Sequence, residues 1–316
     1  MIAEPEWLAE RFEDHRSHLR AVAYRMLGSL AEADDTVQDA WLRASRADAA
    51  AVDNLGGWLT TIVARLCLDR LRTRASRRED PAGLELPEPI VTSPAAAATD
   101  PERQAILADS IGLAMLIVLD RLTPAERLAF VLHDTFGLPF DQIAPIVERT
   151  PTATRQLASR ARRRVRVAAT SDADVPLARQ RELVDAFIAA ARAGDFEALL
   201  RVLDPDVVVR ADTAAAGGPF AGILETRGAR EVAAQALAFR NLAAEARPAI
   251  VNGSAGAVVF SRGRPFAVMA VAIRGDKIVE LDFVLRPDRL ARFDLASRGF
   301  GGLEQRLVGS APREPS

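Results

Sequence analysis

Arginine is concentrated in one short stretch of this sequence. Residues 155–166 hold six arginines in twelve positions, whereas the whole chain of 316 residues carries a formal charge of only −2. Guanidinium groups bind phosphate oxygens and guanine edges, so this stretch suits a polyanionic partner. The alternative is a solvated helix face without a partner. Because every basic residue except Lys277 is arginine, the placement of the arginines is more informative than their abundance.

The stretch lies in a predicted helix-turn-helix. Residues 123–126 read TPAE, a capping box with proline at the first helical position, and Gly137 is expected to end the helix that begins there. A short helix over 141–147 and a second capped helix over 151–166 follow. One face of this last helix collects side chains that suit phosphates and base edges: Thr152, Arg155, Gln156, Ser159, Arg162, Arg163 and Arg166. The arrangement favours DNA as the partner.

Two more charged segments lie before residue 80. Residues 31–44 are predicted to form a helix with four acidic residues and no basic residue before Arg43. Residues 65–78 belong to another predicted helix and hold six arginines against one acidic residue. Charge on a helix is often only solvated, so neither segment alone identifies a partner. An acidic and a basic helix in one small bundle nevertheless favour two different partners.

Helical periodicity and composition divide the chain into three predicted domains. Two all-α domains are expected at 1–80 and 103–167, joined by a proline-rich, extended linker at 81–102. The third domain, at 178–298, reads as helices followed by strands, which predicts an α+β cone with an antiparallel sheet. Apolar and polar side chains alternate in its last strand, so one sheet face is expected to be polar. Residues 299–316 are expected to form a disordered tail.

Composition excludes several classes of protein. Cys67 is the only cysteine, which excludes an internal disulfide and a cysteine-rich zinc site. No apolar run reaches the roughly 18 residues of a membrane-spanning helix. Residues 1–16 resemble neither a secretory signal nor a transit peptide. We therefore expect a cytoplasmic monomer with no metal, no cofactor and no membrane partner.

Three segments resemble a known family: YRMLGSLAEADDTVQDAWLRA, WLTTIVARLCLDRLR and LTPAERLAFVLHDTFGLPFDQIAPIVERTPTATRQLASRARRRVR. They are similar to regions 2 and 4 of an extracytoplasmic-function (ECF) sigma factor of the sigma-70 family. Such proteins are not enzymes. They bind core RNA polymerase, at the β′ clamp helices and the β flap, and direct it to promoter DNA. The resemblance implies that 1–80 is region 2, which binds core and recognises and melts the −10 element, and that 103–167 is region 4, which recognises the −35 element.

The resemblance also implies roles for individual side chains. The contact with core polymerase would involve Asp34, Asp35, Gln38, Asp39 and Trp41. The −10 strand would be held by Trp58, Arg65, Asp69, Arg70, Arg72 and Arg74. The polar face of the helix-turn-helix at 141–166 would read the −35 element.

The third domain resembles the SnoaL-like, nuclear-transport-factor-type extension of one subgroup of these sigma factors, the sigma factor J type. That subgroup carries motifs in its interdomain linker and in the extension. The matching positions here are Leu86, Pro87, Glu88, Pro89, Asp212, Pro287, Asp288 and Leu290. The resemblance implies that the extension modulates the activity of the sigma factor, so these positions are predicted to be regulatory.

Two other functions stay open at this point. A one-component helix-turn-helix regulator would bind duplex DNA alone and sense a small ligand in the C-terminal cone. An enzyme fused to a DNA anchor would use a carboxylate such as Asp282 as its acid or base. Catalysis also needs a second group beside that carboxylate, and the sequence places none there.

Overall fold

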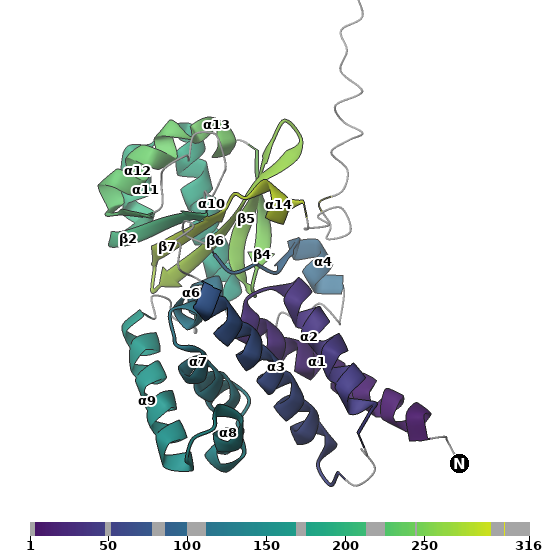
Figure 1. The fold of residues 1–316 in the computed structure, drawn as a ribbon. Coiled ribbons are helices and arrows are strands. Elements are labelled where there is room, and N and C mark those ends of the chain that lie inside the picture. Colours follow the sequence, from purple (N-terminus) through teal and green to yellow (C-terminus); the bar gives the residue numbers. More distant parts are fainter. Residues whose placement is uncertain are drawn as a thin grey trace, which may run out of the picture. The chain divides into compact units, whose positions relative to one another are not determined.

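The chain forms two compact units. In a computed structural model, residues 4–47, 52–77, 86–99, 112–168, 175–212, 225–243, 245–291 and 300 are described. The helical unit contains residues 1–81 and 115–169, and the C-terminal unit contains residues 82–114 and 170–316 (Figure 1). Parts of the predicted linker, and the tail apart from Phe300, lie outside the described residues. The division into three domains stays a prediction.

The first half of the helical unit is a bundle of α1 (Glu4–Leu27), α2 (Leu30–Ala44) and α3 (Leu55–Arg77). Their apolar stripes meet in a core that includes Phe12, Leu19, Met26, Leu59 and Leu68. Cys67 is also buried, and burial raises the pKa of its thiol to about 12. The cysteine therefore serves as a small apolar core residue.

The second half of the helical unit carries the helix-turn-helix. Its elements are α6 (Leu113–Asp120), α7 (Pro124–Phe130), the π-helical turn η2 (Val131–Thr135), α8 (Phe140–Val147) and α9 (Pro151–Ala168). The predicted capping box is present at the start of α7, where Thr123 and Glu126 each accept a hydrogen bond from the other's backbone N–H. The helix predicted to reach Gly137 runs as α7 and then η2. The turn between α8 and α9 places Glu148 in the left-handed conformation (φ 56°).

Four helices pack on one face of the C-terminal sheet (Figure 1). They are α10 (Leu177–Ala193), α11 (Phe196–Val202), α12 (Ala229–Ala238) and α13 (Arg240–Ala243). The first two are separated by a sharp break. Gly194 ends α10 in the left-handed conformation (φ 74°), and Asp195 caps α11 by accepting a hydrogen bond from the N–H of Ala198 at 2.8 Å.

The sheet has seven strands in the order β1-β4-β5-β6-β7-β2-β3. They are β1 (Val91–Thr92), β2 (Leu203–Asp212), β3 (Glu225–Arg227), β4 (Ala246–Val251), β5 (Ser254–Ser261), β6 (Arg264–Arg274) and β7 (Lys277–Val284), and α14 (Pro287–Leu290) follows. The expected antiparallel pairing is wrong for one pair, because β2 runs parallel to β7. The chain between them includes α12, and such a crossover is what lets two strands of one sheet run in the same direction.

The predicted extended linker is only partly extended. Val91 and Thr92 pair with β4 as an edge strand, and α4 (Pro94–Thr99) follows as a short helix. Four consecutive alanines have the highest helix propensity, Pro94 suits a first helical position, and the hydroxyl of Ser93 accepts the N–H of Ala96 at 3.1 Å. Strand β4 was not predicted at all. The fold class of two helical regions followed by an α+β region is confirmed.

The predicted polar face of the last strand is present, but it is not exposed to solvent. Glu280 and Asp282 of β7 are buried, although they alternate with Leu281 and Phe283 as the pattern predicts. The alternation is therefore correct but both faces of the strand are covered. None of the described helices has the length and apolarity that crossing a membrane requires.

Candidate nucleic-acid and polymerase interfaces

The outer face of α2 is acidic and contains one apolar side chain. Asp34, Asp35 and Gln38 are exposed, and Asp39 and Trp41 are partly buried. Trp41 packs edge-on against Phe12 with ring centroids 5.1 Å apart, so it is held by the core of the bundle. Sequence reasoning missed Leu42, whose 46% exposure makes it the exposed large apolar residue among those described. The sequence could have pointed to it, because Leu42 follows Asp35 by seven residues and Gln38 by four, which places all three on one helix face.

The acidic side chains of α2 pair with arginines of the neighbouring helices. Arg20 of α1 donates to both carboxylate oxygens of Asp34 at 2.5 and 3.0 Å. Arg70 of α3 donates to Asp39 at 2.8 Å, and Arg74 pairs with Glu32. These ion pairs are partly exposed to water, where such a pair contributes about 0–1 kcal/mol. A partner can therefore replace them at little cost.

The predicted −10 residues lie along α3. Arg65, Asp69 and Arg72 are exposed, while Trp58, Arg70 and Arg74 are partly buried. Arg72 lies 3.6 Å from the carboxylate of Glu148 in the turn of the helix-turn-helix. Arg70, Arg72 and Arg74 thus already have a carboxylate partner within the helical unit.

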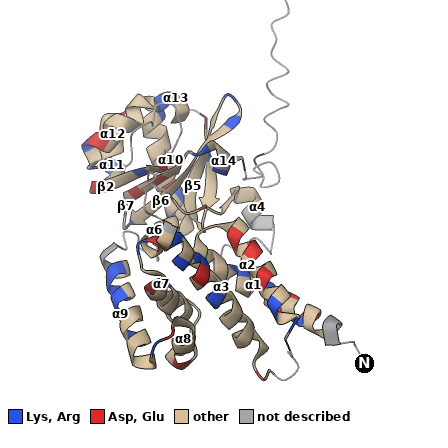
Figure 2. Cartoon of the chain, viewed as in Figure 1, with Lys and Arg blue, Asp and Glu red and all other residues tan. Residues whose placement is uncertain are grey.

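The predicted −35 face of α9 is outward-facing. Thr152, Arg155, Gln156, Ser159 and Arg163 are exposed, and Figure 2 shows basic residues along α9. Arg162 is partly buried and donates to Asp134 at 2.6 Å. Arg155 stacks over the ring of Phe140 at 5.4 Å, which braces the exposed guanidinium. Arg166 belongs to the same helix, but its side chain is not described.

Two other arginines of the same helix are half exposed but pair with a buried carboxylate of α7. Arg160 and Arg164 donate to the carboxylate of Glu126 at 3.3 and 2.6 Å, and the Glu126 side chain is only 4% exposed. Burial alone would raise the pKa of Glu126. Hydrogen bonds from Thr123 and the two guanidinium groups outweigh it, so the pKa lies below its usual 4.5. These two arginines hold α9 to α7 and are not part of the reading face.

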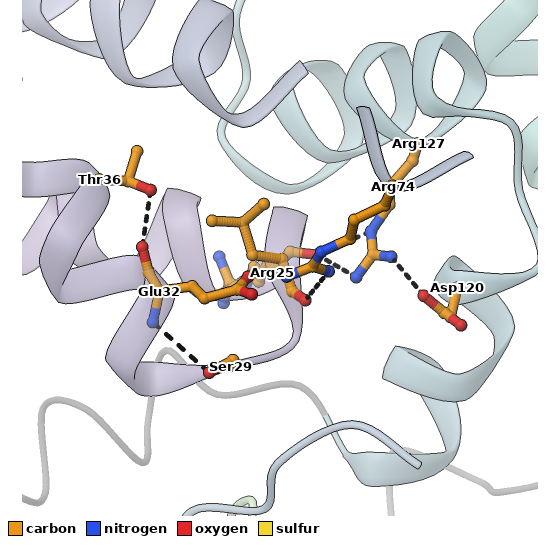
Figure 3. A network of polar contacts seen from close by, with 8 residues as sticks. Arg25, Ser29, Glu32, Thr36, Arg74, Asp120 and Arg127 are labelled. Carbon is orange, nitrogen blue, oxygen red and sulfur yellow. Dashed lines mark hydrogen bonds and ion pairs between the residues drawn. The ribbon is translucent and has the colours of Figure 1, made fainter. Parts of the chain in front are cut away.

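A buried arginine joins the two halves of the helical unit (Figure 3). Arg127 of α7 donates to the backbone carbonyl of Arg25 in α1 at 3.2 and 3.1 Å, and to Asp120 at 3.2 Å. Burial lowers the pKa of Arg127 to about 10, which still leaves it charged at neutral pH. The guanidinium of Arg25 lies 4.6 Å from the ring of Phe136 in the same contact. The predicted regions 2 and 4 are therefore packed together.

In the C-terminal unit, the linker motif meets two of the other predicted motifs. Arg289 donates to the backbone carbonyl of Leu86 and, at 2.6 Å, to the carboxylate of Asp212, which is 0% exposed. Pro87, Glu88, Pro89 and Leu290 are buried, Pro287 is exposed, and the side chain of Asp288 is not described. The structure thus brings Leu86 and Asp212 together through Arg289.

Sequence reasoning missed two residues of this junction. Arg289 lies between the predicted Asp288 and Leu290. An arginine next to a leucine that is expected to be buried needs an acidic partner, and this pattern could have pointed to it. Asn252 begins the Asn-Gly turn between β4 and β5 with φ 50°. Its side-chain oxygen accepts the N–H of Ile90 at 2.9 Å, and its own N–H donates to the Ile90 carbonyl at 2.8 Å.

Asp282 does not lie in the interior of the cone. It shares Arg210 with Glu280, at 3.2 Å from the guanidinium, on the outer face of β7. Leu281 and Phe283, on the opposite face of the strand, line the internal cavity. The carboxylate considered for an enzymatic reaction is therefore engaged in a buried ion cluster, outside the cavity.

Comparisons with known proteins agree along most of the chain. Residues 11–77 match the family of Sigma-70 region 2, and residues 114–165 match that of Sigma-70 region 4. The ECF RNA polymerase sigma factor SigJ of Mycobacterium tuberculosis is 36% identical over 91% of this chain and 94% of its own length. The probable ECF RNA polymerase sigma factor SigI of the same species is 35% identical over 87% and 92%.

A solved structure supports the same relationship. The crystal structure of M. tuberculosis SigJ aligns with 91% of this chain and 99% of its own, at 34% identity and a TM-score of 0.73. The predicted resemblance is confirmed, since both sigma-70 regions are matched in order and a relative aligns through the C-terminal unit as well. The chain belongs to the family of ECF RNA polymerase sigma factors.

Proposed function

We propose that three exposed surfaces of the helical unit divide the work of a sigma subunit. The face of α2 with Asp35, Gln38 and Leu42 docks on core RNA polymerase. The outer side of α3 holds the unpaired −10 strand, and the polar face of α9 reads the −35 element. The observation that carries this proposal is the acidic α2 face with its exposed leucine in the same unit as the helix-turn-helix. A regulator that binds duplex DNA alone needs no such face.

The chemistry of each surface supports its assigned partner. Burial of the Leu42 side chain against a partner would stabilise the complex. The surrounding carboxylates favour a basic partner surface. On α9, arginine and glutamine can form bidentate hydrogen bonds with guanine and adenine in the major groove. On α3, arginines suit the phosphates of a single strand, and Trp58 offers a flat ring for stacking. The chain acts by binding, and it would do so in the cytoplasm, where bacterial promoters are.

Promoter binding requires the two halves of the helical unit to separate. Elements centred at −10 and −35 lie about 25 base pairs apart, which is roughly 85 Å along B-DNA. A compact unit of this size has a radius of gyration of about 14 Å and cannot span that distance. The contacts of Arg127 with Arg25 and of Arg72 with Glu148 therefore belong to the unbound protein. Core polymerase would hold the separated halves in place.

The C-terminal unit is suited to limit this separation. The linker between the two halves is buried in it at Leu86, Ile90 and Val91, and β1 completes its sheet. A linker that is fixed at these points is shorter in reach than a free chain. We therefore infer that the C-terminal unit modulates promoter binding through the linker, and that release of the linker increases the reach of region 4.

The decisive experiment is transcription from a promoter library by core polymerase with and without the full chain. We expect promoter-dependent products only with both. Asp35→Arg should abolish both co-purification with core and product formation, because it reverses the charge of the docking face. Asp185→Arg, the same change at an exposed position of α10, is the matched control and should retain both.

Two outcomes would overturn the proposal. One is the absence of both core binding and promoter-dependent product with the wild-type chain. The other is tight sequence-specific binding to duplex DNA without core, with no effect of Asp35→Arg on transcription from that site. The second outcome would favour a one-component regulator.

A further inference from the structure

An apolar cavity lies inside the C-terminal unit. It is bounded by the inner face of the sheet and by helices that include α10, α12 and α13. The space not filled by atoms amounts to about 710 Å³, including the part open to solvent. The enclosed part is much smaller than this total, so the cavity admits only a small molecule.

The walls of the cavity exclude a charged ligand. Among the described residues that line it none is charged, and four are phenylalanines: Phe187, Phe239, Phe266 and Phe283. A charged ligand would lose its hydration in this cavity without gaining a counter-ion. The acidic cluster of Glu280 and Asp282 lies on the other face of the sheet and does not reach the interior.

One amide supplies the polarity of the lining. Gln235 of α12 donates through its side-chain nitrogen to the hydroxyl of Thr226 at 2.9 Å, which fixes the side chain and leaves its carbonyl oxygen as an acceptor. A buried water needs two to four polar partners, and a single amide offers too few to fill the space with ordered water. An apolar occupant with one hydrogen-bond donor satisfies both the apolar walls and this oxygen.

We propose that the cavity binds a neutral, largely hydrocarbon or aromatic small molecule, whose one polar group donates a hydrogen bond to Gln235. The phenylalanine rings offer edge-on and offset-stacked contacts to a flat ligand. The side chain of Met269, also in the lining, adapts its shape to an irregular one. The site binds without chemistry, because no acid, base or nucleophile is among the lining residues that the structure describes.

The test uses the full chain and the uncharged fluorophore N-phenyl-1-naphthylamine, whose emission rises in apolar surroundings. We expect saturable binding at one site per chain and a higher melting temperature of the C-terminal unit. Ala236→Trp fills the cavity and should weaken binding about tenfold or more. Ala234→Trp makes the same change at an exposed position of the same helix and should bind like the wild type.

A second pair of measurements tests the role of Gln235. Displacement of the fluorophore by 1-naphthol and by naphthalene compares two ligands that differ by one hydroxyl. The wild type should prefer 1-naphthol, and Gln235→Leu should lose that preference while binding naphthalene as before. Equal preference in both proteins would overturn the assigned hydrogen bond.

The cavity itself has its own critical outcomes. Absence of saturable binding, or equal binding by Ala236→Trp and Ala234→Trp, would overturn the proposal. Should Ala236→Trp fail to fold by circular dichroism, Ala243→Trp in α13 fills the same cavity from another side. Because the readout is fluorescence and not transcription, failure here leaves the proposed sigma function untouched, and failure of that function leaves this site untouched.

Discussion

The arginines of the bundle α1–α3 form a different kind of ion pair from Arg210 and Arg289 of the C-terminal unit. In the helical unit, Arg20, Arg70 and Arg72 pair with carboxylates whose side chains are 46–73% exposed. In the C-terminal unit, Arg210 and Arg289 pair with carboxylates that are almost inaccessible to water. Exposed pairs exchange readily with other partners, whereas a buried pair resists separation because each charge would be left without solvent. Surfaces meant for partners thus keep exchangeable ion pairs, whereas Arg289, which holds the linker at Leu86, forms a fixed one.

The largest expected effect follows from removal of a fixed pair. Arg289→Met leaves the buried carboxylate of Asp212 without this guanidinium and should destabilise the C-terminal unit by about 3–5 kcal/mol in urea unfolding. Arg179→Met is the control, since Arg179 forms exposed pairs with Glu182 and Asp276 and its loss should leave the urea midpoint close to that of the wild type. Similar losses in the two variants would erase the contrast between buried and exposed ion pairs.

The next effect concerns the reading face. Arg155→Ala or Arg162→Ala should weaken promoter recognition at the −35 element by about 1–3 kcal/mol if each removes a bidentate guanine contact. Thermal unfolding should change little, because the pair of Arg162 with Asp134 is partly exposed. The measurement is competition between promoter variants for the complete polymerase complex. Unchanged promoter choice in both variants would contradict the assignment of α9.

Glu126 is intermediate between the two kinds of ion pair. It is buried, but its partners Arg160 and Arg164 are half exposed. Glu126→Gln should therefore destabilise the helical unit by only about 1–2 kcal/mol at neutral pH. Glu13→Gln removes an exposed carboxylate whose pKa is also lowered, by its hydrogen bond with Arg16, and should have a smaller effect.

The difference in stability between the wild type and Glu126→Gln should depend on pH in one direction. The pKa of Glu126 in the folded chain lies below 4.5, so its contribution is complete above pH 4.5 and is lost as the pH falls through the folded value. The stabilities of wild type and Glu126→Gln should converge in acid. Divergence toward low pH would show that the carboxylate is not held in its charged form.

The smallest effect separates two adjacent arginines of α9. Arg163→Ala should reduce the slope of log affinity against log salt concentration by about 0.9, the value for one lost phosphate contact. Arg164→Ala should leave this slope unchanged, because Arg164 is engaged by Glu126. Equal slopes for the two variants would mean that both side chains meet DNA, or that neither does.

Local signals made much of the helical unit predictable. The capping box at Thr123, the stop at Gly137 and the apolar stripes of α1 and α3 are all readable over a few residues. Which arginines of α9 face outward is less visible, because Glu126 lies 34 and 38 residues before its two partners. The roles of the individual side chains in binding core and promoter stay predictions.

The C-terminal unit was less predictable because its decisive contacts are not local. Val91 and Thr92 become a strand only through β4, and Arg289 reaches Leu86 across 203 residues of chain. No periodicity in either segment reports such a pairing. Glu280 and Asp282 mark the same limit, since alternation shows that they share a face but not that this face is covered.

The strand contributed by the linker also has a consequence for synthesis of the protein. The hydrogen bond from Ile90 to Asn252 cannot form until the ribosome has added Asn252, 162 residues later. At about 5–20 residues per second this interval lasts roughly 8–30 s, long enough for both helical segments to emerge and fold. The C-terminal unit is thus completed last. A gene fragment that stops at residue 168 yields a chain that lacks β4 and Asn252. Ile90 and Val91 then have no strand to pair with, so the linker of the fragment differs from that of the full chain.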